Sequence, residues 1–182
     1  MSKMDWLKRK RRIIGRIVNR KHLPDYTYRW DTRGPTAIRA QGFQPWNPDG
    51  TIGLMEHVNN SYAANHPQAG QMTKHDSQWL STGAYGMLKK IDPTFAQQIL
   101  NTNLYKIETR LALQTGNFYD ANDTFDRAGV DRPYSTQREW IKEGGIPQEA
   151  IVAYMSGRTF FNQYDMTNGA PDEDALTGWQ AF

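Results

Sequence analysis

The 182-residue sequence contains no cysteine. This absence excludes disulfide bonds, thiolate zinc sites and a cysteine nucleophile, and it favours a reducing environment. The four histidines, His22, His57, His66 and His75, do not form the helical His-Glu-x-x-His pair of zinc proteases. The sequence therefore predicts no metal site.

Long apolar runs are also missing, since none approaches the roughly 20 residues that a membrane span requires. The N-terminal stretch MSKMDWLKRKRRIIGRIVNRK has the charge of a signal peptide, but Arg16 and Arg20 interrupt its apolar part. We therefore expect neither a membrane span nor a Sec signal. Neither GxGxxG after a strand nor GxxxxGK[ST] occurs, which argues against a Rossmann site and a P-loop.

What is present is the composition of a globular protein, 38% hydrophobic and 12% aromatic, at a length that suits one domain with appendages. The net charge of +3 is unevenly spread. Residues 1–22 carry nine basic residues and one acidic residue, whereas the rest carries 13 basic and 18 acidic residues. The sequence therefore predicts a basic arm over 1–24 and a main domain over 25–182.

Within the arm, apolar pairs recur at helical spacing, at Trp6-Leu7, Ile13-Ile14 and Ile17-Val18, with basic residues mostly opposite. We interpret this segment as a helix that docks on the main domain or joins it to a longer delivery polypeptide. Nucleic acid and an anionic membrane surface remain as alternative partners. Lys10 lies inside the apolar stripe and argues against the membrane.

The main domain alternates short elements with long connections. Strands are expected at 26–30, 77–83, 104–113 and 151–161, and helical stretches at 34–43, ended by Gly42, and at 84–100, broken at Pro93. Loops are expected at 45–50, 61–76, 116–133 and 143–147, and 51–60 is ambiguous. The regular βαβ alternation of a doubly wound fold is missing, so we predict an α+β fold.

Three short polar motifs lie on or beside these strands. YRWD places Arg29 and Asp31 on one face of a strand, with Tyr28 and Trp30 on the other. Arg29 is interpreted either as a clamp for a phosphate or a neighbouring loop, or as half of a structural ion pair at a sheet edge.

The second motif, QWLSTG, ends a strand in Ser81 and Thr82, and Ser81 is also a candidate cap for the helix that follows. The third motif, YSTQREW, sets Gln137 and Glu139 on one face if the segment is extended, with Tyr134 at the end of the loop before them.

In this order, the motifs resemble those of the mono-ADP-ribosyltransferase toxins of the cholera and pertussis toxin catalytic-subunit class. The likeness extends to YRWDTRGPTAIRAQGFQPW, to GLMEH with His57, and to TQREWIKEGGIPQEAI, and it covers about residues 26–156. It implies two short antiparallel or mixed sheets that form an NAD cleft with flanking helices.

The resemblance implies that the protein cleaves the N-glycosidic bond of NAD+, used as a co-substrate without a metal. As nicotinamide leaves, positive charge develops on the ribose, and a nearby carboxylate stabilises it. Glu139 is the implied carboxylate. Ser81 and Thr82 would brace the cleft and hydrogen-bond Glu139, and His57 would act near the ribose or help to activate the acceptor.

By the same resemblance, Arg29 holds the NAD+ phosphate and the strand geometry, and Asp31 fixes the neighbouring loop. Arg33 also matches, without an assigned role. The family's third residue after Ser-Thr is replaced by Gly83, which leaves no side chain for a role there.

The acceptor depends on the residue two before the glutamate. In the family a Glu there accompanies arginine targets, and a Gln accompanies other acceptors. Gln137 is a neutral amide that cannot pair ionically with a guanidinium, so an arginine target is disfavoured. Tyr134 would pack on the acceptor. A protein acceptor is favoured, because the main domain is acidic, and DNA or RNA remains the alternative acceptor, because the basic arm and Gln137 are compatible with nucleic acid.

The resemblance further implies a bacterial toxin or effector that acts in the target-cell cytoplasm. Delivery would use a contractile injection system, a larger polymorphic toxin or another signal-independent route, and an immunity protein is an expected partner. The alternatives are a non-catalytic binding protein on the same fold and an NAD+ glycohydrolase without an acceptor. Residues 161–182 are expected to be a packed tail.

Overall fold

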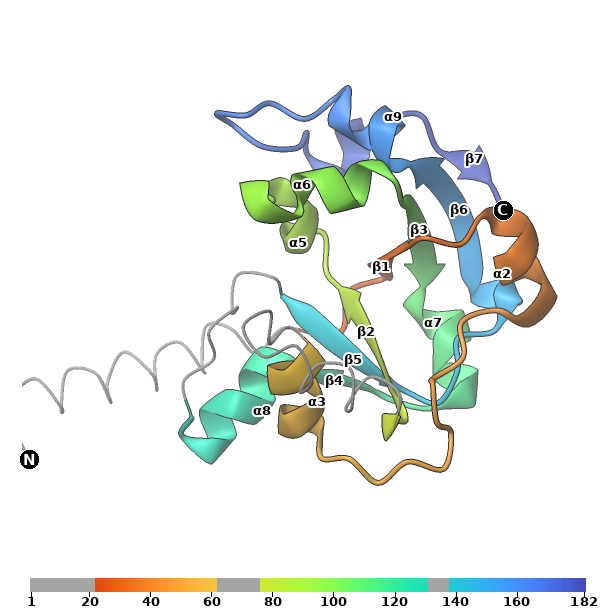
Figure 1. The fold of residues 1–182 in the computed structure, drawn as a ribbon, viewed down its shortest axis with the longest axis vertical. Helices are drawn as coiled ribbons and strands as arrows, with labels where there is room; N and C mark the ends of the chain where they lie inside the picture. Colours follow the sequence, from red (N-terminus) through yellow and green to blue (C-terminus); the bar gives the residue numbers. More distant parts are fainter. Residues whose placement is uncertain (1–21, 62–75, 131–137) are drawn as a thin grey trace, which may run out of the picture.

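The computed structural model describes residues 22–61, 76–130 and 138–182 (Figure 1). The predicted basic helix of the arm lies outside the described residues. So do Tyr134 and Gln137.

The described part of the chain is built on one antiparallel sheet of seven strands in the order β4-β5-β2-β1-β3-β6-β7 (Figure 1). The strands are β1 Tyr26–Asp31, β2 Trp79–Gly83, β3 Asn103–Glu108, β4 Phe118–Asp120, β5 Glu139–Glu143, β6 Ile151–Ser156 and β7 Gln180–Ala181. Helices connect and flank the strands, so the α+β prediction is confirmed.

The expectation of two sheets is wrong, because the hydrogen-bonded order is continuous. Its weak point lies between β1 and β2, which share one registered pair, Tyr28 with Gly83. By contrast, β1 pairs with β3 over six residues, and β2 pairs with β5 over five. The β1–β2 junction is therefore where the sheet has the fewest backbone bonds and where side chains from both strands can border a cleft.

Short helices from along the described chain flank the sheet (Figure 1). Their bounds are α2 Pro35–Gln41, α3 Leu54–Ser61, α5 Gly86–Lys89, α6 Pro93–Leu100, α7 Thr109–Ala112, α8 Ala121–Ala128 and α9 Gly157–Phe161. The predicted end of α2 is confirmed, since Gly42 adopts a φ of 65°. The predicted break at Pro93 is also confirmed, because proline suits the first turn of α6.

Three local assignments differ from the sequence predictions. The loop expected at 116–133 contains β4 and α8, because Asp120 caps α8 by accepting from the backbone N–H groups of Asn122 and Asp123. The strands expected at 104–113 and 151–161 end at Glu108 and Ser156, where α7 and α9 begin. The ambiguous stretch 51–60 holds most of α3.

Alternate residues of β3 belong to two apolar clusters on opposite faces of the sheet, as Leu104 and Tyr105 illustrate, and a third cluster joins Ile141 of β5 to α3 and α8. The tail at 161–182 packs on the clusters of Leu104 and Tyr105, as expected. Trp179 stacks on Tyr28 at 6.0 Å between ring centres, and Phe182 meets Tyr105 edge-on at 6.1 Å. Within the described ranges, no helix is long and apolar enough to cross a membrane.

Candidate active site

Arg29 bridges the weak junction of the sheet. From β1, its Nη1 donates a hydrogen bond of 2.8 Å to the backbone carbonyl of Ser81 on β2. Its guanidinium carbon also lies 5.2 Å from the centre of the Phe43 ring, within cation–π range. The side chain is 22% exposed, so one edge of the fork faces the cleft while another holds the two strands together.

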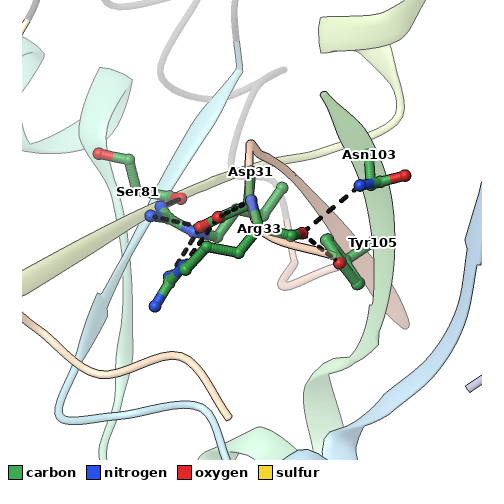
Figure 2. A network of polar contacts seen from close by, with 6 residues as sticks. Asp31, Arg33, Ser81, Asn103 and Tyr105 are labelled. Carbon is green, nitrogen blue, oxygen red and sulfur yellow. Dashed lines mark hydrogen bonds and ion pairs between the residues drawn. The ribbon is translucent and has the colours of Figure 1, made fainter. Parts of the chain in front are cut away.

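Asp31 fixes the loop that follows β1. It accepts from the backbone N–H and Nε of Arg33 at 2.9 Å each and from Nη2 at 2.8 Å, and Arg29 Nη2 lies 3.6 Å away. Burial raises the pKa of Asp31, but the Arg33 hydrogen bonds and the two guanidinium charges outweigh it, so the pKa is lowered. The backbone carbonyl of Arg33 accepts from Tyr105 and Asn103 on β3 (Figure 2).

The side chain of His57 on α3 contacts Ser81 on β2. Its Nε2 lies 3.0 Å from Ser81 Oγ and its Nδ1 lies 2.7 Å from Ser77 Oγ, and the residue is 6% exposed. Burial, assisted by the positive charge of Arg29, lowers its pKa to about 4. The imidazole is therefore neutral at physiological pH, with one ring nitrogen donating and the other accepting.

Glu139 is the first residue of β5 and is 2% exposed. It stands opposite Gly83, while Thr82 stands opposite Trp140. The expected hydrogen bonds from Ser81 and Thr82 to Glu139 are wrong. The Ser81 hydroxyl bonds His57, and the Thr82 hydroxyl donates to the carbonyl of Trp140, its partner in the strand register, at 2.8 Å.

Two neighbouring features define the surroundings of Glu139. Arg138 has a φ of 48°, a left-handed conformation that is uncommon outside glycine, and its carbonyl accepts from Ala84 N–H at 3.0 Å. A Cβ on Gly83 would lie 2.4 Å from the sulfur of Met87. The side chain of Met87 therefore fills the space beside Gly83.

Ser81 is not a helix cap, because it lies in the middle of β2 and the residue before α5 is Tyr85. Its side chain instead belongs to the site.

Two cavities meet at the β1–β2 junction and share Arg29, Trp30 and Ser81. The first, about 330 Å³, also contains Glu139 and Thr82. The second, about 630 Å³, contains His57 and Asp31. The structure therefore gathers six of the predicted site residues around two cavities that share part of their lining: Arg29, Asp31, His57, Ser81, Thr82 and Glu139.

Sequence reasoning missed the wall opposite the strands. In the first cavity this wall is formed by residues 87–99 of α5, α6 and the segment between them. In the second cavity, Trp46, which is 59% exposed, and Trp79 are both lining residues. The helical spacing of apolar residues predicts α6, but it does not predict which face of α6 lines the cavity.

Metal ligands do not cluster in the described residues, where no group of three or more His, Asp or Glu side chains is placed to hold an ion.

No family model matches the chain, and no curated protein matches its sequence. Solved structures do match. A guanine-specific ADP-ribosyltransferase has a TM-score of 0.53 at 16% identity, over 88% of this chain and 78% of that one. Scabin toxin from Streptomyces scabies, in complex with NADH, has a TM-score of 0.48 at 20% identity over 84% and 72%. EcPltA has 0.47 at 21% over 71% and 74%.

The match at a TM-score of 0.53 spans most of both chains, so this chain has the fold of ADP-ribosyltransferases.

Proposed function

We propose that this protein is a toxin or effector that cleaves NAD+ and transfers ADP-ribose to a macromolecular acceptor. The observation that carries the proposal is the position of Glu139, a buried carboxylate at the start of β5 that borders the same cavity as Arg29 and Ser81. A carboxylate and a guanidinium at one cleft match the two charges of the substrate, the developing ribosyl cation and the pyrophosphate.

In the proposed reaction, the bond between nicotinamide and the anomeric carbon breaks, and its electron pair leaves with neutral nicotinamide. Positive charge passes to the ribose, where Glu139 stabilises it. An acceptor nucleophile then bonds to the same carbon and releases a proton. Because Glu139 borders only the first of the two cavities described here, the nicotinamide riboside belongs there.

The shared wall suits the pyrophosphate, because the Arg29 guanidinium borders both cavities and its planar fork of donors matches the geometry of phosphate oxygens. The adenosine end would then occupy the second cavity, beside Trp46. His57 holds Ser81 at this wall as a neutral ring, which keeps a positive charge away from the developing cation.

For the acceptor, we propose a group other than arginine, with Gln137 and Tyr134 as its contacts. A protein acceptor suits the acidic main domain. The solved neighbour whose name states guanine specificity makes a guanine base the specific alternative. An immunity protein and a delivery apparatus would be the partners of such an effector in its producing cell.

The test is to incubate the protein with NAD+ labelled in the adenylate part and a cell lysate, then to digest the product with protease or nuclease. We expect macromolecular label that protease removes. Label that only nuclease removes would replace protein by nucleic acid as the acceptor, and release of nicotinamide without labelling would identify a glycohydrolase. Glu139→Gln is the blank, and Glu143→Gln, exposed at the other end of β5, is the matched control.

A further inference from the structure

The wall opposite Glu139 is built from small pieces of structure. α5 has four residues, α6 has eight, and Met87, Ile91 and Phe95 face the first cavity from this stretch. Helices this short do not hold their place by themselves, because the cost of the first turn is not recovered. The position of the wall therefore depends on what packs behind it.

Behind it lies the segment 164–176 near the end of the chain, here called the C-terminal brace (Figure 1). The Tyr85 hydroxyl donates to the backbone carbonyl of Pro171. Lys89 Nζ lies 2.6 Å from Asp172 Oδ1 and 3.1 Å from the Ala170 carbonyl. These bonds join α5 and the residue before it to the brace.

Backbone groups of the wall are bound as well. The carbonyl of Lys89 accepts from Ala170 N–H at 3.0 Å, and Ile91 N–H donates to the Tyr164 hydroxyl at 2.9 Å. Gly169 has a φ of +83°, and a Cβ there would lie 1.7 Å from the Lys89 carbonyl oxygen. The brace thus approaches α5 more closely than any residue with a side chain would allow.

The brace also holds the floor of the cavity. The Tyr28 hydroxyl on β1 donates to Glu173, and the Tyr28 ring meets Tyr85 edge-on at 5.6 Å. Burial, reinforced by Glu173, raises the pKa of Tyr28, and burial with nearby carboxylates raises that of Tyr85 to about 12. Both hydroxyls therefore remain protonated donors throughout the physiological pH range.

We infer that the C-terminal brace positions the α5–α6 wall of the NAD+ cavity, with Tyr85 as the main positioning residue. The inference rests on the proposed function for its substrate, but the contacts that carry it lie outside the group of Arg29, Ser81 and Glu139. The sequence predicts only packing for residues 164–176, whereas this inference gives them a positioning role. The brace sets the width of the cavity, and hence the affinity for NAD+, whereas Glu139 sets the rate of bond breaking.

The test compares Tyr85→Phe with Tyr154→Phe. Each removes one tyrosine hydroxyl that bonds the C-terminal segment, but Tyr154 on β6 bonds Gln180 and borders neither cavity. In Tyr85→Phe we expect amide hydrogen exchange across residues 86–100 to accelerate about fivefold and the NAD+ Kd and KM to rise about fivefold, with kcat within about twofold of wild type. Tyr154→Phe should change none of these.

Gly169→Ala is the second variant, and it should move the same quantities further in the same direction, because its methyl group displaces the brace from α5. Unchanged amide hydrogen exchange across residues 86–100 in Tyr85→Phe would overturn the inference that the C-terminal brace holds the α5–α6 wall. Faster exchange with unchanged NAD+ affinity would overturn the inference that the position of this wall controls NAD+ binding. If wild type neither binds nor cleaves NAD+, the proposed function is what fails, and the exchange comparison still decides whether the brace holds the wall.

Discussion

Acidification should destabilise the protein through one buried imidazole, that of His57. Its pKa is about 4 in the folded protein, against an ordinary value of 6.5. Between these two pH values the unfolded chain binds one proton more at this residue, so the free energy of unfolding falls as the pH falls. A shift of about 2.5 units corresponds to about 3 kcal/mol, which is fully lost below pH 4.

The structural reason is that protonation would place a second cation beside Arg29 in a site that is 6% exposed, and would turn both ring nitrogens into donors. The assay is urea unfolding at intervals from pH 7 to pH 4, for wild type and for His57→Gln, which keeps a neutral donor and acceptor. Wild type should lose about 3 kcal/mol more than the variant over this range. Equal losses in the two proteins would refute the reasoning.

Three further changes test other parts of the account. Arg29→Lys should lower kcat/KM for NAD+ by at least about tenfold, measured by nicotinamide release, because one ammonium cannot replace a fork that holds the Ser81 carbonyl and also faces the cleft. Arg138→Val should lower the free energy of unfolding by about 1–2 kcal/mol, since a β-branched residue resists a φ of 48°, while Arg138→Gly should not. For Lys142, fully buried with its pKa lowered to about 8, stability should rise between pH 8 and 10.5 in wild type but not in Lys142→Met.

Each of these has a result that would contradict it. Wild-type kinetics in Arg29→Lys would show that the fork is not used on the substrate. Equal stability of the valine and glycine variants at position 138 would show that the left-handed conformation costs nothing. A rise with pH that persists in Lys142→Met would assign it to another group.

The strand carrying Arg29 and Asp31 could be predicted from sequence, because alternation places both on one face whatever the rest of the chain does. The same local logic gave the end of α2 at Gly42. It failed at 116–133, because Asn, Asp and Gly are the residues of loops and also those that begin and end helices, as Asp120 and Gly129 do for α8.

The interior of the site depended on contacts between distant residues. His57 and Ser81 are 24 positions apart, and Tyr85 and Pro171 are 86 apart, so no spacing rule connects either pair. The resemblance supplied the residue types of the cleft, but it misplaced the hydroxyls of Ser81 and Thr82. The hydrogen-bond partners of these hydroxyls depend on the strand register, and a pattern of residue types does not specify that register.

The most direct test of the account is the rate of nicotinamide release from NAD+ by wild type, Glu139→Gln and Glu143→Gln at saturating substrate. The amide keeps the shape of the buried side chain and removes its charge, so Glu139→Gln should lose about a thousandfold in rate, about 4 kcal/mol of barrier, while binding NAD+ with unchanged Kd. Glu143→Gln should retain the wild-type rate. Equal rates in wild type and Glu139→Gln would contradict the central claim that this carboxylate stabilises the positive charge that develops on the ribose as nicotinamide departs.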